Sequence, residues 1–339
     1  MYIIIALIGF SLLIIVHEFG HFIMAKINKI KVEEFSIGMG PIIFSVNGKE
    51  TIYSLRMFPI GGYIKMLGEE DNNDDIRSFS KQTPIRKISV ILAGVTMNFI
   101  FAIASLSIVI FNQGFYELKI SSIDENSPAV HAGLKVEDTI IKVNGDNVFT
   151  PTDILLDIQF SNVKVLNLLV DRNGEKKEII FEPKLVNVNG ENKYILGYHY
   201  KLNDKPTISQ SFKQSINEIL SILNQTFKSI KMMAKGELSF KDNVGGPITI
   251  VRMSYQAAKN GVMTLIYFLG FISLNLAIFN FIPFPALDGG WTVIILIEMI
   301  TRRKVPDKIV GMINYFGFIV LMGIMILIVL KDILFPINI

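Results

Sequence analysis

The feature that most constrains this chain is a set of four apolar stretches, each long enough to form a helix that crosses a lipid bilayer. A spanning helix needs roughly 20 apolar residues at a rise of about 1.5 Å each. Hydrophobic residues make up 50% of the 339 residues, which is high for a soluble protein. The stretches cover residues 1–25, 88–111, 262–284 and 311–330. The sequence therefore predicts a polytopic α-helical membrane protein with about four transmembrane helices.

The polar segments between these stretches divide the chain into four parts. Residues 1–111 hold the first two stretches, joined by a loop whose strands meet at Asn47-Gly48, a strong β-hairpin signal. Residues 112–202 alternate as short strands, and SPAVHAGLKVEDTIIKVNG resembles a PDZ domain, an α+β fold that binds peptide ends at a sheet edge. Residues 203–261 are expected to be a helical linker. Residues 262–339 hold the last two stretches.

Within the linker, residues 206–234 place apolar side chains three or four positions apart, which predicts one apolar helical face. The face runs from Ile208 to Ile230, with lysines on the rest of the helix. Two placements are open for it. The helix lies on the membrane surface, or it packs against the neighbouring domain.

Lysine and arginine residues near the ends of the apolar stretches predict the orientation in the membrane. They gather in the loop before the second stretch and in the loop before the fourth, which includes Arg302, Arg303 and Lys304. Both loops, with the hairpin, are therefore expected on the cytoplasmic side, and the PDZ-like domain outside. A net charge of +3, without a basic stripe interleaved with aromatic residues, argues against a nucleic-acid partner.

The first apolar stretch contains His17-Glu18-Phe19-Gly20-His21, an H-E-x-x-H motif. On a helix, residues four positions apart share a face, so both histidines can bind one metal ion. Glu18 is placed to act as a general base toward a zinc-bound water, whose pKa falls to about 7. The alternative is a structural His–Glu pair that reaches toward the membrane surface. Charged side chains in a spanning helix cost about 2.5–3.5 kcal/mol each, which favours a functional site.

A zinc peptidase needs a third protein ligand and one open position. The chain has no cysteine and only four histidines, so the candidates are few. His131 and His199 fall in the predicted external domain and are expected at its surface. Asp288 is the better candidate, because Pro283 and Pro285 should break the third apolar helix just before it. The alternative is that Asp288 is the N-cap of the following helix.

Together these motifs resemble the site-2 protease family, and most closely its bacterial regulator-of-sigma-E protease type. The resemblance rests on HEFGH, on NFIPFPALDGG at 280–290 and on the PDZ-like stretch, and it covers nearly the whole chain. It implies an intramembrane zinc metalloprotease of the bacterial cytoplasmic membrane, with its site toward the cytoplasm. Carried over by position, it implies His17, His21 and Asp288 as Zn²⁺ ligands and Glu18 as the catalytic base.

The resemblance also implies residues that bind substrate. Asn280 matches the family's asparagine before paired prolines, and with Pro283 and Pro285 it is expected to hold substrate near the metal. Gly94 and Asn98 match a Gly-x-x-x-Asn pattern of the second helix. The family commonly has proline after this glycine, where this chain has valine, so the helix is expected to bend less. Both asparagines have a structural alternative, as buried amides that join helices.

A helical substrate must unwind before it is cut, because its own hydrogen bonds enclose the peptide carbonyls. The hairpin at about 41–58 is expected to offer a sheet edge for the unwound segment. The expected partners are the lipid bilayer, single-span membrane proteins such as anti-sigma factors or leftover signal peptides, and peptide ends at the PDZ-like domain. The alternatives are a membrane-anchored peptidase for soluble peptides, a non-enzymatic scaffold and a transporter with a broken helix.

Overall fold

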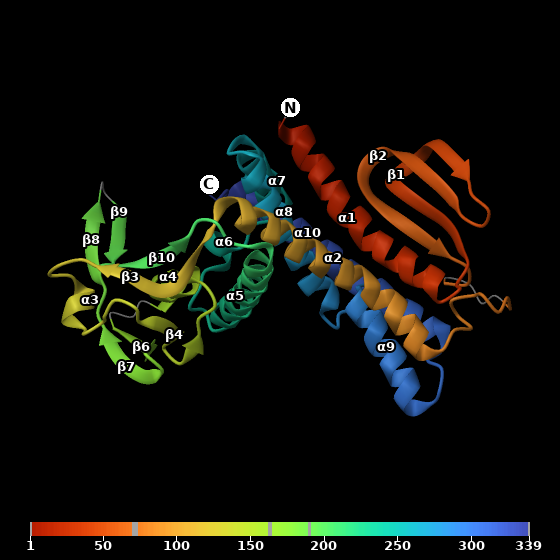
Figure 1. The fold of residues 1–339 in the computed structure, drawn as a ribbon. Coiled ribbons are helices and arrows are strands. Elements are labelled where there is room, and N and C mark those ends of the chain that lie inside the picture. The colour runs from red at the N-terminus through yellow and green to blue at the C-terminus, as the bar shows by residue number, and fades with distance from the viewer. Residues whose placement is uncertain (1, 70–73, 162–164, 189–190, 338–339) are drawn as a thin grey trace. The chain divides into compact units, whose positions relative to one another are not determined.

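The computed structural model describes residues 2–69, 74–161, 165–188 and 191–337, which form two compact units. The first, called the membrane unit, consists of Met1–Ser105 and Lys241–Ile339. The second, called the sheet unit, consists of Leu106–Phe240 and is inserted in the chain between the two parts of the first. Figure 1 shows the elements of both units.

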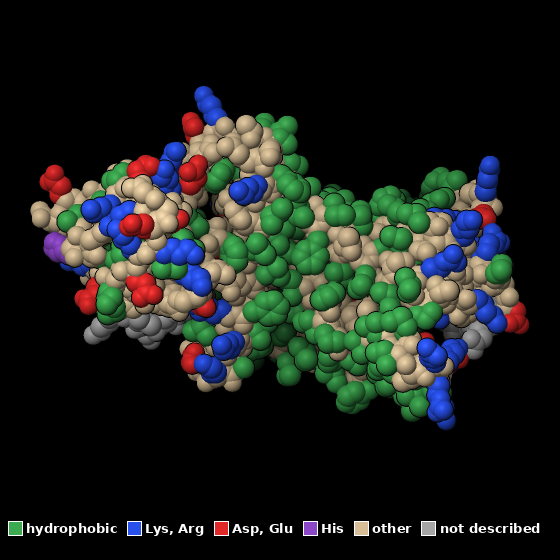
Figure 2. All heavy atoms as spheres, turned by 60° about the horizontal axis from the view of Figure 1, so that its bottom comes forward, with side chains coloured by type: hydrophobic (Ala, Val, Ile, Leu, Met, Phe, Trp, Pro, Cys, Tyr) green, Lys and Arg blue, Asp and Glu red, His purple; other side chains and the backbone are tan. Residues whose placement is uncertain are grey.

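Four helices are long and apolar enough to cross a membrane. They are α1 (Tyr2–Ile27), α2 (Pro84–Gln113), α8 (Val262–Phe281) and α10 (Asp307–Leu334). Only 6% of the most apolar window of α10 is buried, so most of its apolar surface is left for lipid. Figure 2 shows hydrophobic side chains gathered over the membrane unit, with lysine and arginine side chains collected at one end. These helices fit the predicted polytopic membrane protein.

A sheet of two long strands follows α1, formed by β1 (Val32–Asn47) and β2 (Ile52–Met66). They meet near the predicted Asn47-Gly48 signal, where the Gly48 N–H donates to the Thr51 carbonyl at 2.9 Å. Both strands bend, near glycines with positive φ at 38, 40 and 61. As a result their segments lie side by side in the order 42–47, 52–56, 32–37 and 62–66. The last segment, 62–66, is therefore an outer edge of this sheet and is called the edge strand.

Three shorter helices belong to the part of the chain after residue 239: α6 (Phe240–Asn243), α7 (Pro247–Lys259) and α9 (Asp288–Thr301). α7 packs against α1, α8 and α10. Asp332 of α10 accepts hydrogen bonds from the backbone N–H groups of Gly246 and Thr249, at 3.1 and 2.9 Å, and so caps α7. A buried apolar cluster joins α1, the sheet, α2 and α9.

The sheet unit is an α+β fold around one buried core. Its strands are β3 (Phe115–Ile123), β4 (Thr139–Val143), β5 (Asp146–Asn147), β6 (Leu166–Arg172), β7 (Glu175–Phe181), β8 (Lys184–Val188), β9 (Glu191–Ile195) and β10 (Tyr198–Asn203). The main sheet has the order β10-β3-β4-β6-β7, with β5 beside β4, and β8 and β9 form a separate hairpin. The helices α3 (Pro128–His131) and α4 (Pro151–Ser161) complete the fold. The turns at Asn144-Gly145 and Asn173-Gly174 have positive φ at both residues, as hairpin signals predict.

The amphipathic helix predicted at 206–234 is α5 (Ile208–Ala234). It begins with a capping box between Thr207 and Gln210. Its polar side contacts α4, where the Ser221 hydroxyl donates to Asp153 at 2.6 Å. The apolar side chains on its other face are exposed: Ile208, Phe212, Ile216, Leu220, Phe227 and Ile230. Ile219, which also belongs to the predicted apolar face, is buried, so this face is exposed only in part.

Candidate metal centre

Two histidines of α1 meet one helical turn apart inside the membrane unit. His17 and His21 are 7% and 8% exposed, and their Nε2 atoms lie 3.2 Å apart. Their ring planes are nearly perpendicular, at 88°, and the short separation of the Nε2 atoms brings both to one point. The four-residue spacing of the motif thus places both imidazoles as a pair of metal ligands requires.

The chain brings Asp288 to the same point by ending α8 early. α8 ends at Phe281, and the segment that contains Pro283 and Pro285 forms a turn before α9 begins at Asp288. Ala286 has φ +70°, and its N–H donates to Asn314 of α10 at 3.2 Å. A methyl group at position 289 would lie 2.2 Å from the Ile282 carbonyl oxygen, so only glycine lets the turn fold back this tightly.

The three predicted ligand side chains converge. Asp288 Oδ2 lies 3.2 Å from His17 Nε2 and 3.7 Å from His21 Nε2. Ligands at about 2.0–2.1 Å from a tetrahedral zinc ion are roughly 3.3 Å apart, so these separations fit that ion. Asp288 Oδ2 is buried and has no hydrogen-bond partner among the described residues. The N-cap of α9 is Leu287, and no side chain caps the helix, so Asp288 is not the N-cap.

Both imidazoles are held from behind by α2. The Val90 carbonyl lies 2.8 Å from His21 Nδ1, so Nδ1–H donates to it and the Nε2 lone pair faces the other ligands. The Asn98 amide nitrogen lies 3.1 Å from His17 Nδ1, while the Asn98 Oδ1 atom is buried and has no hydrogen-bond partner in the described part of the chain. A half-turn of the amide places Oδ1 beside His17 instead, where it accepts Nδ1–H. In that orientation both histidines present Nε2 to the metal position.

Gly94 gives the second helix its close approach to this centre. A methyl group at this position would lie 2.5 Å from His21 Nε2 and 2.7 Å from His17 Cε1. Asn98, one turn further along the same helix, is fully buried and contacts His17. The Gly-x-x-x-Asn spacing thus combines space for two imidazoles with a polar partner for one of them. α2 runs without interruption from Pro84 to Gln113, and the expectation that it bends less than in the family stays a prediction.

Glu18 lies between the metal position and the edge strand. A cavity of about 230 Å³ is lined by the three predicted ligands, by Glu18 and by Tyr63, Ile64 and Met66 of the edge strand. The Ile64 backbone N–H is directed at the Glu18 carboxylate. The strand next to the metal position is therefore 62–66, whereas the sequence pointed to 41–58. The difference arises because residues 32–37 of β1 pair on both sides, with 62–66 and with the segment that follows the turn. The segments on either side of the turn, 42–47 and 52–56, are therefore further from the site.

A polar network holds the edge strand to the rest of the sheet. Glu34 accepts hydrogen bonds from the hydroxyls of Ser54 and Tyr63, at 2.5 and 2.6 Å, and from Arg56 at 2.8 Å. Burial opposes the charge on Glu34, but these three donors together outweigh it and lower the pKa of this carboxyl. The Tyr63 hydroxyl is thereby tied to neighbouring strands, while its side chain lines the metal cavity.

The other predicted site residues lie outside the metal cavity. Asn280 is in the last turn of α8 and half-buried, and its side chain has no hydrogen bond to the described residues. Pro283 is exposed, and Pro285 packs against Gly317 of α10. A role for these residues in binding substrate stays a prediction. His131 and His199 lie at the surface of the sheet unit, where His199 pairs with Asp124 at 3.1 Å.

Two imidazoles, one carboxylate and an adjacent glutamate have the geometry of a metal-dependent hydrolase. The sequence matches peptidase family M50 over residues 5–324. A predicted zinc metalloprotease of Clostridium perfringens is 45% identical over 99% of this chain and 100% of its own length. Another, from Clostridium acetobutylicum, is 41% identical over 99% of this chain and 98% of its own length. The zinc metalloprotease RasP of Geobacillus kaustophilus is 25% identical over 96% of each chain.

The chain therefore belongs to peptidase family M50, the site-2 protease family. It is a zinc metalloprotease, and the predicted family, enzyme class and metal are confirmed. Tyr63 and Trp291 line the metal cavity but were not identified from the sequence as site residues. Trp291 follows the Gly-Gly pair directly, and that position beside a predicted ligand is the signal that could have marked it.

Proposed function

We propose that this protein cleaves peptide bonds within or near the transmembrane segments of other membrane proteins. The observation that carries the proposal is the position of the candidate ligands. His17 and His21 lie inside a helix that is apolar enough to cross the bilayer, and α2, which packs behind them, is another. A hydrolase site at that depth meets polypeptide that is itself in the membrane.

We assign His17, His21 and Asp288 as the metal ligands and Glu18 as the general base. Zinc bound there supplies Lewis acidity toward a water molecule and toward the scissile carbonyl. Glu18 takes a proton from the attacking water and later delivers it to the nitrogen of the leaving amine. Val90 and Asn98 keep the imidazoles in the tautomer that presents Nε2. Burial of the ligand atoms excludes bulk water from all but the open side.

The edge strand is the element that we expect to receive the substrate. One side of 62–66 pairs with 32–37, and the other side faces the cavity that contains Glu18. An unwound substrate segment can add to this edge as a further strand, which supplies the backbone partners that it loses on leaving its helix. This arrangement holds the scissile carbonyl beside Glu18.

The surroundings of the site suggest its partners and its orientation. The substrates are proposed to be single-span membrane proteins, such as anti-sigma factors or leftover signal peptides. The basic loops support a proposed orientation in which the metal centre lies toward the cytoplasmic side of a bacterial inner membrane and the sheet unit lies outside. The sheet unit is proposed to act as a PDZ-like domain for peptide ends, and its strand order leaves β10 with one partner at the edge of the main sheet.

The test uses purified wild type and Glu18→Gln in detergent, each incubated with a single-span helical substrate. Both proteins are expected to hold about one zinc ion, because Gln replaces no ligand. Cleavage by Glu18→Gln is expected to fall at least about 100-fold, because the general base is lost. Mass spectrometry locates the cuts. Cuts confined to soluble parts of the substrate would favour a peptidase for soluble peptides, and equal cleavage by both proteins would exclude this active site.

A further inference from the structure

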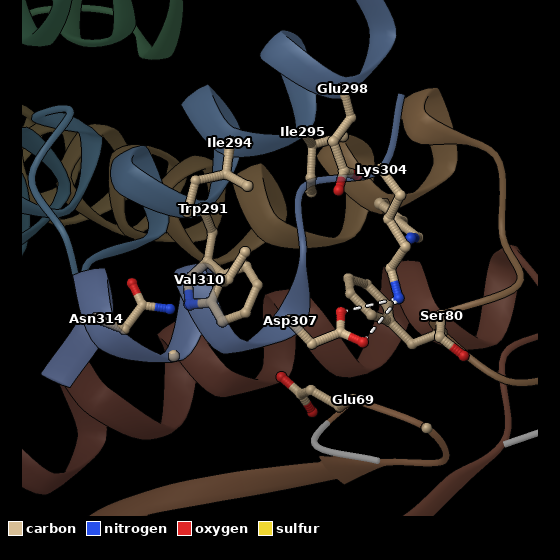
Figure 3. A pocket seen from close by; sticks show the side chains of 14 residues that line it. Glu69, Ser80, Trp291, Ile294, Ile295, Glu298, Lys304, Asp307, Val310 and Asn314 are labelled. Carbon is tan, nitrogen blue, oxygen red and sulfur yellow. Dashed lines mark hydrogen bonds and ion pairs between the residues drawn. The ribbon is translucent and has the colours of Figure 1, made fainter. Parts of the chain in front are cut away.

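A second and larger cavity lies next to the metal cavity in the membrane unit. It encloses about 590 Å³, within the roughly 300–1,000 Å³ range of small-molecule and cofactor sites. We call it the flank cavity. Figure 3 shows that its walls come from the loop after β2, from α9 and from the start of α10. Lys87, in the first turn of α2, and Asp307, the first residue of α10, both line it. Because these residues mark the ends of two spanning helices, the flank cavity lies at the boundary of the membrane.

The flank cavity adjoins the metal cavity. Glu69, Phe79 and Trp291 line both cavities, so the side chains of these three residues lie at the boundary between the two. The edge strand ends at Met66, and Gly68 and Glu69 lead from it into the flank cavity. A substrate segment laid along the edge strand therefore passes Glu18 first and continues into the flank cavity with its next residues.

The chemistry of the lining favours a long cationic side chain. Trp291 offers an aromatic face, the best partner for a cation among the side chains. Figure 3 shows the Trp291 ring and the carboxylates of Glu69 and Asp307 around the same space. Three carboxylates line the cavity against two ammonium groups, and the Lys304 ammonium is paired with Asp307 at 2.8 Å.

Glu298 provides the acidic group best placed to change partners. One of its oxygens accepts the Val305 N–H at 2.9 Å, and the other has no hydrogen bond to the described residues. Lys87 is the opposing charge. It lies over the Phe79 ring, 5.8 Å from the centroid, and forms no ion pair with the described part of the chain.

We propose that the flank cavity binds a lysine or arginine side chain from the segment that follows the substrate's spanning helix on the side of the metal centre. The inference rests on the proposed function and adds a specificity site to it. Spanning helices carry an excess of lysine and arginine at their cytoplasmic ends. A site that requires such a residue places the scissile bond at a fixed distance from the end of the substrate's helix.

The test compares three single-span substrates that differ only in two residues of this flank: Lys-Lys, Gln-Gln and Glu-Glu. The zinc-loaded full chain is expected to show a kcat/KM for Lys-Lys about five-fold above that for Gln-Gln, with Glu-Glu lowest, because an exposed ion pair is worth roughly that factor. Glu298→Gln keeps an oxygen for the Val305 N–H and should bring the Lys-Lys to Gln-Gln ratio close to one. Lys87→Gln should raise the ratio, which a folding defect cannot do.

Glu50→Gln is the control, because Glu50 lies outside both cavities and pairs with Lys26 and Arg77. It should leave the ratio at the wild-type value. Equal cleavage of the three substrates by the wild type, or an unchanged ratio in both cavity variants, would overturn the inference while the proposed function stands. If zinc-loaded wild type cuts none of them, the proposed function fails and the inference falls with it.

Discussion

The metal centre and the edge strand both adjoin Glu18, but they are held in opposite ways. The centre consists of two buried histidines and the half-buried Asp288, all on helices, and two of its ring nitrogens have partners behind them on α2. The edge strand consists of backbone that pairs with 32–37 on one side and with no strand among the described residues on the other. The difference separates two requirements: chemistry needs ligands fixed in one geometry, whereas a changing substrate needs hydrogen-bonding groups that are still available.

The largest effect is expected when one of the proposed ligands is removed from the metal centre. Asp288→Ala should reduce zinc affinity by more than the roughly 100-fold typical of residues behind the ligands, and activity should be lost with it. Zinc content after dialysis against a chelator measures the effect. Asp124→Ala, at the surface of the sheet unit, is the matched control. Wild-type zinc affinity in Asp288→Ala would remove this residue from the ligand set.

Crowding the imidazoles tests whether the centre is as rigid as its packing indicates. Gly94→Ala puts a methyl group 2.5 Å from His21 Nε2, and zinc affinity should fall by up to about 100-fold as the rings are displaced. Gly311→Ala makes the same change in α10, where the added methyl group meets no described atom within 4 Å apart from its chain neighbours and its own helix backbone, and should leave zinc affinity unchanged. Similar zinc affinity in both variants would mean that the centre yields easily.

Asn98 tests the support behind a ligand. Asn98→Leu removes the hydrogen bond to His17 and should weaken zinc binding by about 10- to 100-fold, whereas Asn98→Asp keeps an acceptor and should lose less. Binding of cobalt, followed by its visible spectrum, reports the ligand geometry independently of activity. Equal loss in the two variants would mean that Asn98 acts through packing alone.

Proline on the edge strand tests whether the substrate adds to the side of 62–66 that does not pair with 32–37. Ile64→Pro removes a backbone N–H that faces Glu18, and it should slow cleavage of a helical substrate about ten-fold more than that of an already extended peptide. Val46→Pro, on the opposite outer segment of the same sheet, is the control and should not change that ratio. Equal losses on both substrates in Ile64→Pro would count against strand addition.

The smallest expected effect is a pH dependence of the sheet beside the site. Hydrogen bonds from Ser54, Tyr63 and Arg56 lower the pKa of Glu34 despite its burial. A lowered native pKa contributes stability that is present above the ordinary value of 4.5 and is lost as pH falls through the lowered pKa. The free energy of unfolding of the wild type, measured by thermal unfolding, should therefore decrease by roughly 1 kcal/mol as the pH falls below about 4.5. Glu34→Gln should lack this component.

Local patterns in the sequence were sufficient for the helices and for the three residues that converge. The positions of the four spanning helices follow from apolar length alone, and two of the ligand candidates are four residues apart on one of them. Asp288 is distant in the chain, yet the paired prolines before it and the two glycines after it predict the break that brings it back.

The edge strand could not be predicted in this way. Which segment of a bent sheet becomes its edge depends on pairing between residues far apart, and here 32–37 pairs on both sides. The alternation of side chains along β2 is the same whether residues 41–58 or residues 62–66 face the site. Trp291 could not be identified as a site residue for a related reason. It lines two cavities, and both are created by packing between residues that are far apart in the chain.

The insertion of the sheet unit between the two parts of the membrane unit also sets an order of events during synthesis. His17 and His21 leave the ribosome early, and Asp288 follows only after the entire sheet unit. At about 5–20 residues per second the two histidines wait roughly 10 to 60 s for their third partner. With the proposed assignment, the nascent chain has the general base and two of the three metal ligands during that interval but no complete metal centre, so we expect it to be inactive as a protease while it is being inserted into a membrane full of other proteins' helices.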